Sequence, residues 1–217
     1  METKPVPNVS LGEEIANAVS HGIGAVLSLA SLILLVIHAS LCAPPEYRVR
    51  ITVGYVVFGL SLIFLYMMST LYHAITHQKA KNIFQLLDHA AIFVLISGSY
   101  TAFCLAIFRD IRGILILSTV WALGIIGIVF STILGARFKL FSLILYLAMG
   151  WMIVINYREF AANATPLTFW LVVAGGLAYT SGFVFYALQR YPWMHVVWHF
   201  FVLAGSILHI IAAYAAI

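Results

Sequence analysis

A chain of 217 residues with 64% hydrophobic and only 8% charged residues cannot cover a folded surface with enough charge to face water. Soluble domains carry about 25% charged residues, so this composition, with a mean hydropathy of +1.06, predicts an integral membrane protein. The net charge of +4 lies in short loops without a basic run, which argues against nucleic-acid binding. Cys42 and Cys104 are too few for a disulfide framework, and we expect both to be free packing residues near one membrane face.

Seven apolar segments are each long enough to cross a bilayer, which takes about 20 helical residues. They lie at approximately 19–41, 52–74, 84–107, 113–133, 139–157, 167–188 and 194–216. The loops between them are short, so we expect a single membrane domain over residues 1–217. The predicted fold class is all-α, a seven-transmembrane helix bundle. Small residues in the segments allow close helix contact: Gly98, Gly124, Gly127, Gly175 and Gly182.

The loop charges bear on the orientation, because an odd number of spans puts the two termini on opposite sides of the membrane. The N-terminal side receives six basic residues: Lys4, Lys79, Lys81, Arg137, Lys139 and Arg190. The other side receives five: Arg48, Arg50, Arg109, Arg112 and Arg158. The positive-inside rule therefore leans toward a cytoplasmic N-terminus, by a difference of one charge.

A capping-box pattern, Ser10 with Glu13 three residues later, precedes the first apolar segment. It predicts a short N-terminal interfacial helix that begins there and runs into the membrane. The first turns of this helix carry Glu14, Asn17 and His21, which share one face at spacings of three and four residues. These three residues are either a second shell around a site at this membrane face or a solvated interfacial surface.

The last segment begins with His195 and His199, whose spacing of four places both imidazoles on one helix face. Ionisable side chains are costly in a membrane, so they indicate function by default. Ser69 and His73 repeat the spacing at the end of the second segment, and Asp88 lies near the start of the third. Because successive spans alternate in direction, all five residues lie at the membrane face of the N-terminus.

Three imidazoles from two helices, an open fourth position and a nearby carboxylate suit a zinc ion. We predict His73, His195 and His199 as its ligands. Zinc with three neutral ligands lowers the pKa of a bound water toward about 7. Asp88 would orient that water or take its proton, and Ser69 would hydrogen-bond it or a developing oxyanion. A site near one interface, within the hydrocarbon depth, suggests a lipid substrate that arrives from the bilayer.

Simpler interpretations stay open for two of these residues and apply to the other histidines. Asp88 is also explained as a helix-start carboxylate favoured by the helix dipole, and Ser69 as a packing or capping residue. His209 lies about 21 Å from His195 along the same helix, too far to bind the same metal. The histidines expected outside the metal site are His38, His77, His89 and His209.

Six segments of the chain together resemble the hemolysin III family, bacterial members of the progestin and adiponectin receptor superfamily. They are Glu14–Gly22, Ser69–His73, Leu87–His89, Gly98–Thr101, Tyr146–Trp151 and His195–His199. The resemblance extends from about residue 10 to residue 217. One departure is Ala102, where similar proteins often have a proline, and its loss would straighten a kink in the third span.

The resemblance implies a seven-helix bundle in the bacterial inner (plasma) membrane with a cytoplasmic N-terminus. It also implies a zinc ion near the cytoplasmic face. Residues matching His73, His195 and His199 would hold the ion, Asp88 would contact it through water, and Ser69 would lie close by. Eukaryotic relatives, and the similar alkaline ceramidases, are linked to zinc-dependent hydrolysis of a lipid amide such as ceramide.

Our leading functional hypothesis is a zinc-dependent hydrolase of a lipid amide or ester that acts in membrane lipid homeostasis, with membrane lipids as its partners. The alternative is a receptor-like or sensor protein whose zinc is structural and catalyses no reaction. A cytolytic pore or transporter is the third hypothesis. It is disfavoured because Asp88 is the one acidic residue that we expect inside a span.

Overall fold

The computed structural model describes residues 9–134 and 139–217, which form helices and no strand. Seven helical segments in this part of the chain are long and apolar enough to cross a membrane, which confirms the predicted fold class. The elements are α1 (Leu11–Cys42), α2 (Arg48–Ala74), α3 (Gln78–Ile107), α4 (Ile111–Leu134), α5 (Lys139–Gly150), the 3₁₀ segment η2 (Met152–Asn156), α6 (Tyr157–Asn163), α7 (Pro166–Ala187) and α8 (Met194–Tyr214).

The first span begins where the capping box predicts. Ser10 accepts a hydrogen bond from the Glu13 backbone N–H, and the Glu13 side chain accepts one from the Ser10 backbone N–H. The expected interfacial helix is therefore the first part of α1, which continues without a break to Cys42. Helix α3 likewise runs unbroken through Ala102. The loop charges Lys4 and Arg137 lie outside the described residues.

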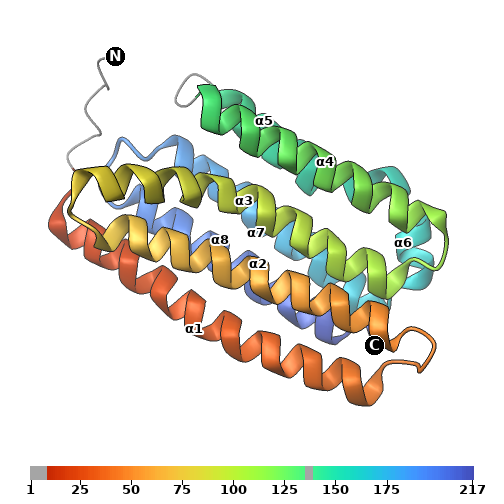
Figure 1. The fold of residues 1–217 in the computed structure, drawn as a ribbon. Helices are drawn as coiled ribbons and strands as arrows, with labels where there is room; N and C mark the ends of the chain where they lie inside the picture. Colours follow the sequence, from red (N-terminus) through yellow and green to blue (C-terminus); the bar gives the residue numbers. More distant parts are fainter. Residues whose placement is uncertain (1–8, 135–138) are drawn as a thin grey trace.

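The helices form a bundle in which α1, α2 and α3 lie side by side, with α8 and α7 behind them and α4 and α5 at the other edge (Figure 1). The end of α2 and the starts of α1, α3 and α8 lie at one end of the bundle, and the C-terminus lies at the other (Figure 1). Helix α3 is the most buried span, whereas less than a third of the apolar window of α1, α4 and α7 is buried. This arrangement gathers the predicted site residues at one end of the bundle.

The fifth span differs from the predicted single helix over 139–157. Helix α5 ends at Gly150, and the chain continues through η2 and α6 to Asn163. The Tyr100 hydroxyl group bridges this break, since it donates to the Gly150 carbonyl oxygen at 3.0 Å and accepts from the Ile153 N–H at 2.8 Å. An unpaired backbone group is costly inside a bilayer, so a side chain from α3 makes this irregular segment tolerable.

Glycines at the predicted positions let helices approach closely. At all five positions a Cβ atom would meet a side chain of another helix. At Gly127 of α4, a Cβ atom would lie 2.3 Å from the ring of Phe93 on α3. By contrast, a Cβ atom at Gly22 of α1 would meet Thr70 at an ordinary 3.8 Å.

Gly127→Ala is expected to destabilise the protein relative to Gly22→Ala. Both substitutions gain the same helix propensity, about 1 kcal/mol. Only the first forces the Phe93 ring to move, and overpacking of this kind costs about 1–3 kcal/mol. Thermal unfolding of both variants in the same detergent measures the difference. Equal melting temperatures would contradict the close α3–α4 packing.

Candidate metal centre

Three histidines meet at the end of the bundle where α1 begins. His73 is in the last turn of α2, and His195 and His199 are in the first two turns of α8. Each offers one ring nitrogen, and these three atoms lie within 4.8 Å of one another. His199 is fully buried, His73 is 8% exposed, and His195 is half-buried. The structure thus brings together the three residues predicted as metal ligands, in a cluster that can hold a metal ion.

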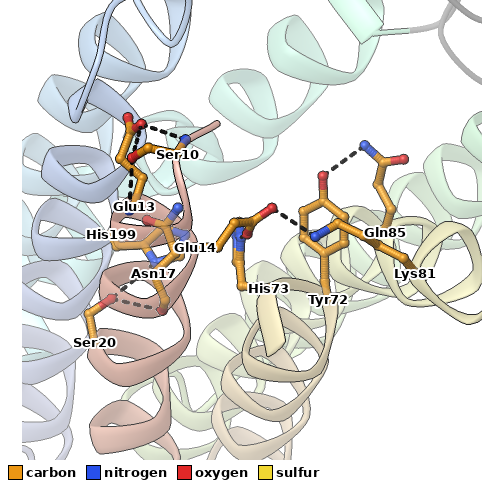
Figure 2. Close-up of polar contacts among 10 residues, drawn as sticks. All are labelled: Ser10, Glu13, Glu14, Asn17, Ser20, Tyr72, His73, Lys81, Gln85 and His199. Carbon is orange, nitrogen blue, oxygen red and sulfur yellow. Dashed lines mark hydrogen bonds and ion pairs between the residues drawn. The ribbon is translucent and has the colours of Figure 1, made fainter. Parts of the chain in front are cut away.

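A carboxylate orients the ring of His73. Its Nδ1 lies 2.6 Å from Oε2 of Glu14 on α1. Nδ1 therefore carries the ring proton and donates a hydrogen bond to the carboxylate. The other carboxylate oxygen, Oε1, accepts from Lys81 Nζ at 2.7 Å. Figure 2 shows Glu14 between His73 and Lys81, joining α1, α2 and α3. The Nε2 lone pair of His73 is therefore available to a metal.

The ring of His199 is oriented by Ser20, through a chain of two hydrogen bonds (Figure 2). The Ser20 hydroxyl donates to the Asn17 carbonyl oxygen at 3.0 Å. Having used its proton there, Ser20 Oγ accepts from Nδ1 of His199 at 3.2 Å. This fixes the tautomer of His199 with the proton on Nδ1 and the lone pair on Nε2.

These contacts make the cluster fit a metal ion. Nε2 of His73 and Nε2 of His199 are both buried and have no hydrogen-bond partner among the described residues. A buried imidazole nitrogen normally has a partner, and its absence here needs an explanation. Histidines that bind metals typically donate their other N–H to a carboxylate or another oxygen, as both rings do. Zinc is a metal that three neutral imidazoles suit.

The carboxyl group of Asp88 lies beside this cluster on α3. It is 4% exposed, is within electrostatic range of His73, and is adjacent to Ser69 of α2. Ser69 is fully buried, and its hydroxyl group has no hydrogen bond of ordinary geometry within the described part of the chain. Asp88 and His21 also line one end of a cavity of about 100 Å³. The site therefore combines the imidazole cluster, a carboxyl group, a hydroxyl group and an adjoining cavity.

The stripe Glu14, Asn17 and His21 points inward. Asn17 and His21 are 0% and 1% exposed, which contradicts the interpretation as a solvated surface. The His21 ring stacks on His199 with the ring centres 3.5 Å apart and the planes 6° apart. In the described structure, both side-chain polar atoms of Asn17 and both ring nitrogens of His21 are buried without a hydrogen bond. The stripe packs directly behind the histidine cluster.

Comparison with known proteins identifies the family. The family model "Haemolysin-III related" matches residues 9–210. "Hemolysin-3" of Bacillus cereus is 42% identical over 194 residues, which cover 89% of this chain and 87% of that protein. The chain belongs to the haemolysin III family. This family is part of the progestin and adiponectin receptor superfamily.

Two further relatives show the breadth of this similarity. The "Hemolysin-3 homolog" of Bacillus subtilis strain 168 is 42% identical over 197 residues, 91% of each chain. The human "Monocyte to macrophage differentiation factor" is 24% identical over 166 residues, which cover 70% of this chain and 66% of that protein. No solved structure matches the chain. With its bacterial relatives and seven apolar helices, this haemolysin III protein is a multi-pass integral protein of the plasma membrane.

The remaining histidines and both cysteines of this haemolysin III protein are not members of the three-histidine cluster. His38 is hydrogen-bonded to the Tyr214 carbonyl oxygen at 3.1 Å, and His209 to that of Val172 at 3.3 Å. His77 is exposed and caps α3. His89 follows Asp88, and its backbone carbonyl oxygen accepts from Tyr146. Cys42 and Cys104 are free.

Sequence reasoning missed three residues that hold the cluster in place. Ser20 orients His199, and Lys81 holds the carboxylate of Glu14. Glu13 accepts from the backbone N–H of Trp193 at 2.5 Å, and this bond ties the start of α1 to the turn before α8. Trp193 has a positive φ of 66°, which is uncommon for a bulky residue. The position of Ser20, one turn after Asn17, was a signal in the sequence for its role.

Glu14→Gln is expected to lower the metal affinity by about 10- to 100-fold, because a neutral amide supports the basicity of His73 less well than a carboxylate. Competition with a metal-binding dye measures this change. Lys81→Met is the matched control. It removes the partly exposed ion pair with Glu14, which contributes about 0–1 kcal/mol, and the contact of the ammonium group with the Tyr72 ring, but it keeps the Glu14 carboxylate on His73. An affinity that falls equally in both variants would mean that the ion pair, and not the orientation of His73, supports the site.

Proposed function

We propose that this protein is a zinc-dependent hydrolase of a lipid amide or ester. The observation that carries the proposal is the pair of buried Nε2 atoms, on His73 and His199, left without partners beside the Asp88 carboxyl group. Zinc held there by His73, His195 and His199 would act as a Lewis acid. It would also lower the pKa of a bound water toward neutral pH. The three-imidazole donor set leaves room for water or substrate, as in catalytic zinc sites.

The roles of the neighbouring residues follow from their chemistry. Asp88 is the buried carboxyl group next to the histidines, and it would accept the proton of the attacking water. Ser69 has a hydroxyl group with no other ordinary hydrogen bond, and it would donate to the carbonyl oxygen of the substrate as negative charge develops there. Glu14 and Ser20 would keep the imidazole rings in position. Activation of the water and stabilisation of the oxyanion therefore each have a buried group suited to them.

A lipid substrate is supported by the cavity that begins at Asp88 and His21. Its wall is mostly apolar and is built from α3, α5, α7 and α8. Such a wall suits an acyl chain whose amide or ester group lies beside Asp88. An N-acylated sphingoid base is the substrate class that the family resemblance suggests. With the N-terminus in the cytoplasm, which the loop charges favour, the centre would lie in the cytoplasmic leaflet.

The test is release of fatty acid from ceramide by purified protein in detergent. Zinc-loaded protein is expected to release it, protein treated with a chelator is not, and added zinc restores the release. No release from a panel of lipid amides and esters, with zinc bound, would contradict the hydrolase.

A sensor with a structural metal is the second candidate, and one observation favours it. The residues around the site join α1, α2, α3 and α8 through the histidines, Glu14 and Lys81. A metal there would stabilise four spans at once. A large fall in melting temperature on chelation, together with no turnover, would support this function. The apolar wall of the cavity offers no support for an ion pore. Ion flux through vesicles that contain the reconstituted protein would support the pore hypothesis.

A further inference from the structure

The break in the fifth span lies at Trp151, about midway along that span. Trp151 lies between the end of α5 and η2, where Tyr100 satisfies the backbone on both sides of the break. A Cβ atom at Gly150 would meet nothing within 4 Å, so the chain has open space at this point. The segment Tyr146–Trp151 was one of those that resemble the family, and the proposed chemistry gives Trp151 no role.

The indole ring of Trp151 is held against α7. Its Nε1–H donates to Thr180 Oγ1 at 3.0 Å, while the Thr180 hydroxyl donates to the Gly176 carbonyl oxygen at 2.7 Å. The ring also lies against Gly176, where a Cβ atom would be 3.5 Å from it. One hydrogen bond and one flat contact therefore hold the ring to α7.

Two cavities meet at this ring. The first, of about 100 Å³, extends from Asp88 and His21 to His209. The second, of about 50 Å³, also reaches His209 and is lined by Phe103 and Phe160. The residues that line both are Gly150, Trp151, Gly176 and His209. Trp151 has the largest side chain of the four, and it lies where the two spaces would join.

We propose that Trp151 is a specificity-determining residue that sets the length of acyl chain the protein accepts. The proposal rests on the proposed function, in which the first cavity holds the acyl chain of the substrate. With the ring on Thr180, the chain ends at Trp151. When the ring leaves Thr180, the second cavity extends the space. Trp151 is not one of the clustered donors and its hydrogen bond is to Thr180, so we expect it to act on chain length and not on the chemistry.

The cavity volumes give the size of the expected effect. An apolar cavity of about 150 Å³ holds benzene, which corresponds to about 25 Å³ per carbon atom. By this measure the first cavity, of about 100 Å³, holds about four carbons of the acyl chain, and the second, of about 50 Å³, adds space for about two more. Removing the indole ring adds its own volume, so two carbons is the smallest extension expected.

The test is chain-length preference, measured in two ways on the zinc-loaded, full-length protein. Saturated fatty acids of increasing length are compared by the rise in melting temperature that they cause, and N-acyl sphingoid bases of the same lengths by hydrolysis rate. Trp151→Ala is expected to shift the preferred length upward by at least about two carbons. The matched control is Trp170→Ala on α7, a ring that is 66% exposed and expected to leave the preference unchanged.

Thr180→Val provides a milder variant that keeps the ring and removes its hydrogen bond, together with the bond from the Thr180 hydroxyl to Gly176. It is expected to broaden the preference toward longer chains, and it tests the proposal where Trp151→Ala does not fold. An unchanged length preference in the folded variants overturns the role of Trp151, whether or not hydrolysis occurs. A shift in fatty-acid binding without hydrolysis in any variant supports Trp151 and removes the hydrolase.

Discussion

His199→Ala is expected to abolish stoichiometric metal binding. The substitution removes one of three nitrogen donors, and the remaining two, His73 and His195, cannot complete a site of the kind that zinc occupies in proteins. Loss of a residue that only orients a ligand already costs about 10- to 100-fold in affinity, so loss of the ligand itself should cost more. The metal content per chain after purification in zinc-containing buffer, measured by plasma emission spectroscopy, checks this prediction.

His209→Ala is the matched control for this measurement. His209 is in the same helix, also contacts aromatic rings, and makes its own hydrogen bond to Val172. Its replacement removes a similar volume from the bundle but no donor from the cluster. We expect this variant to keep one metal per chain. Retention of zinc by His199→Ala, or equal loss in both variants, would mean that the three-histidine cluster is not the metal centre.

The spans and the histidine cluster were predictable because each depends on a local pattern. A run of about 20 apolar residues identifies a span without knowledge of its neighbours. The spacing of His195 and His199 places both rings on one helix face, and the alternating direction of the spans brings His73 to the same end of the bundle. The cluster therefore needed only helix periodicity and span order.

The break in the fifth span was not predictable, because its cause lies elsewhere in the sequence. Gly150 and Trp151 belong to an apolar run that reads as a continuous helix. The break is stabilised by the hydroxyl group of Tyr100, which is 50 residues earlier in the chain. Hydropathy reports burial in lipid, and it carries no information on which side chain will satisfy a free carbonyl oxygen.

The residues that orient the cluster were predictable only in part. Glu14 shares a helix face with Asn17 and His21, so the sequence groups them, and the structure places Glu14 on His73. Lys81 appeared in the sequence only as a loop charge, but the turn between α2 and α3 brings its side chain back to Glu14. Contacts of this kind depend on the path of a turn and on rotamers, which residue spacing does not determine.

Asp88→Asn is expected to reduce hydrolysis by about 100- to 10,000-fold, the range that general acid–base groups contribute. The amide preserves the size of the side chain and removes its ability to accept a proton. Because Asp88 is not one of the three clustered donors, the variant should keep its zinc, and the loss should appear in kcat. Steady-state kinetics on a lipid amide, together with metal analysis of the same sample, separates loss of chemistry from loss of metal.

Asp110→Asn is the control for this variant. Asp110 lies at the opposite end of the bundle, where it is 40% exposed and pairs with Arg112, so its replacement should leave both turnover and metal content unchanged. Full hydrolysis by Asp88→Asn would remove Asp88 from the chemistry. Loss of zinc with loss of activity would instead assign Asp88 to the metal site itself. Only lost turnover with retained zinc fits a carboxylate that handles the proton of water.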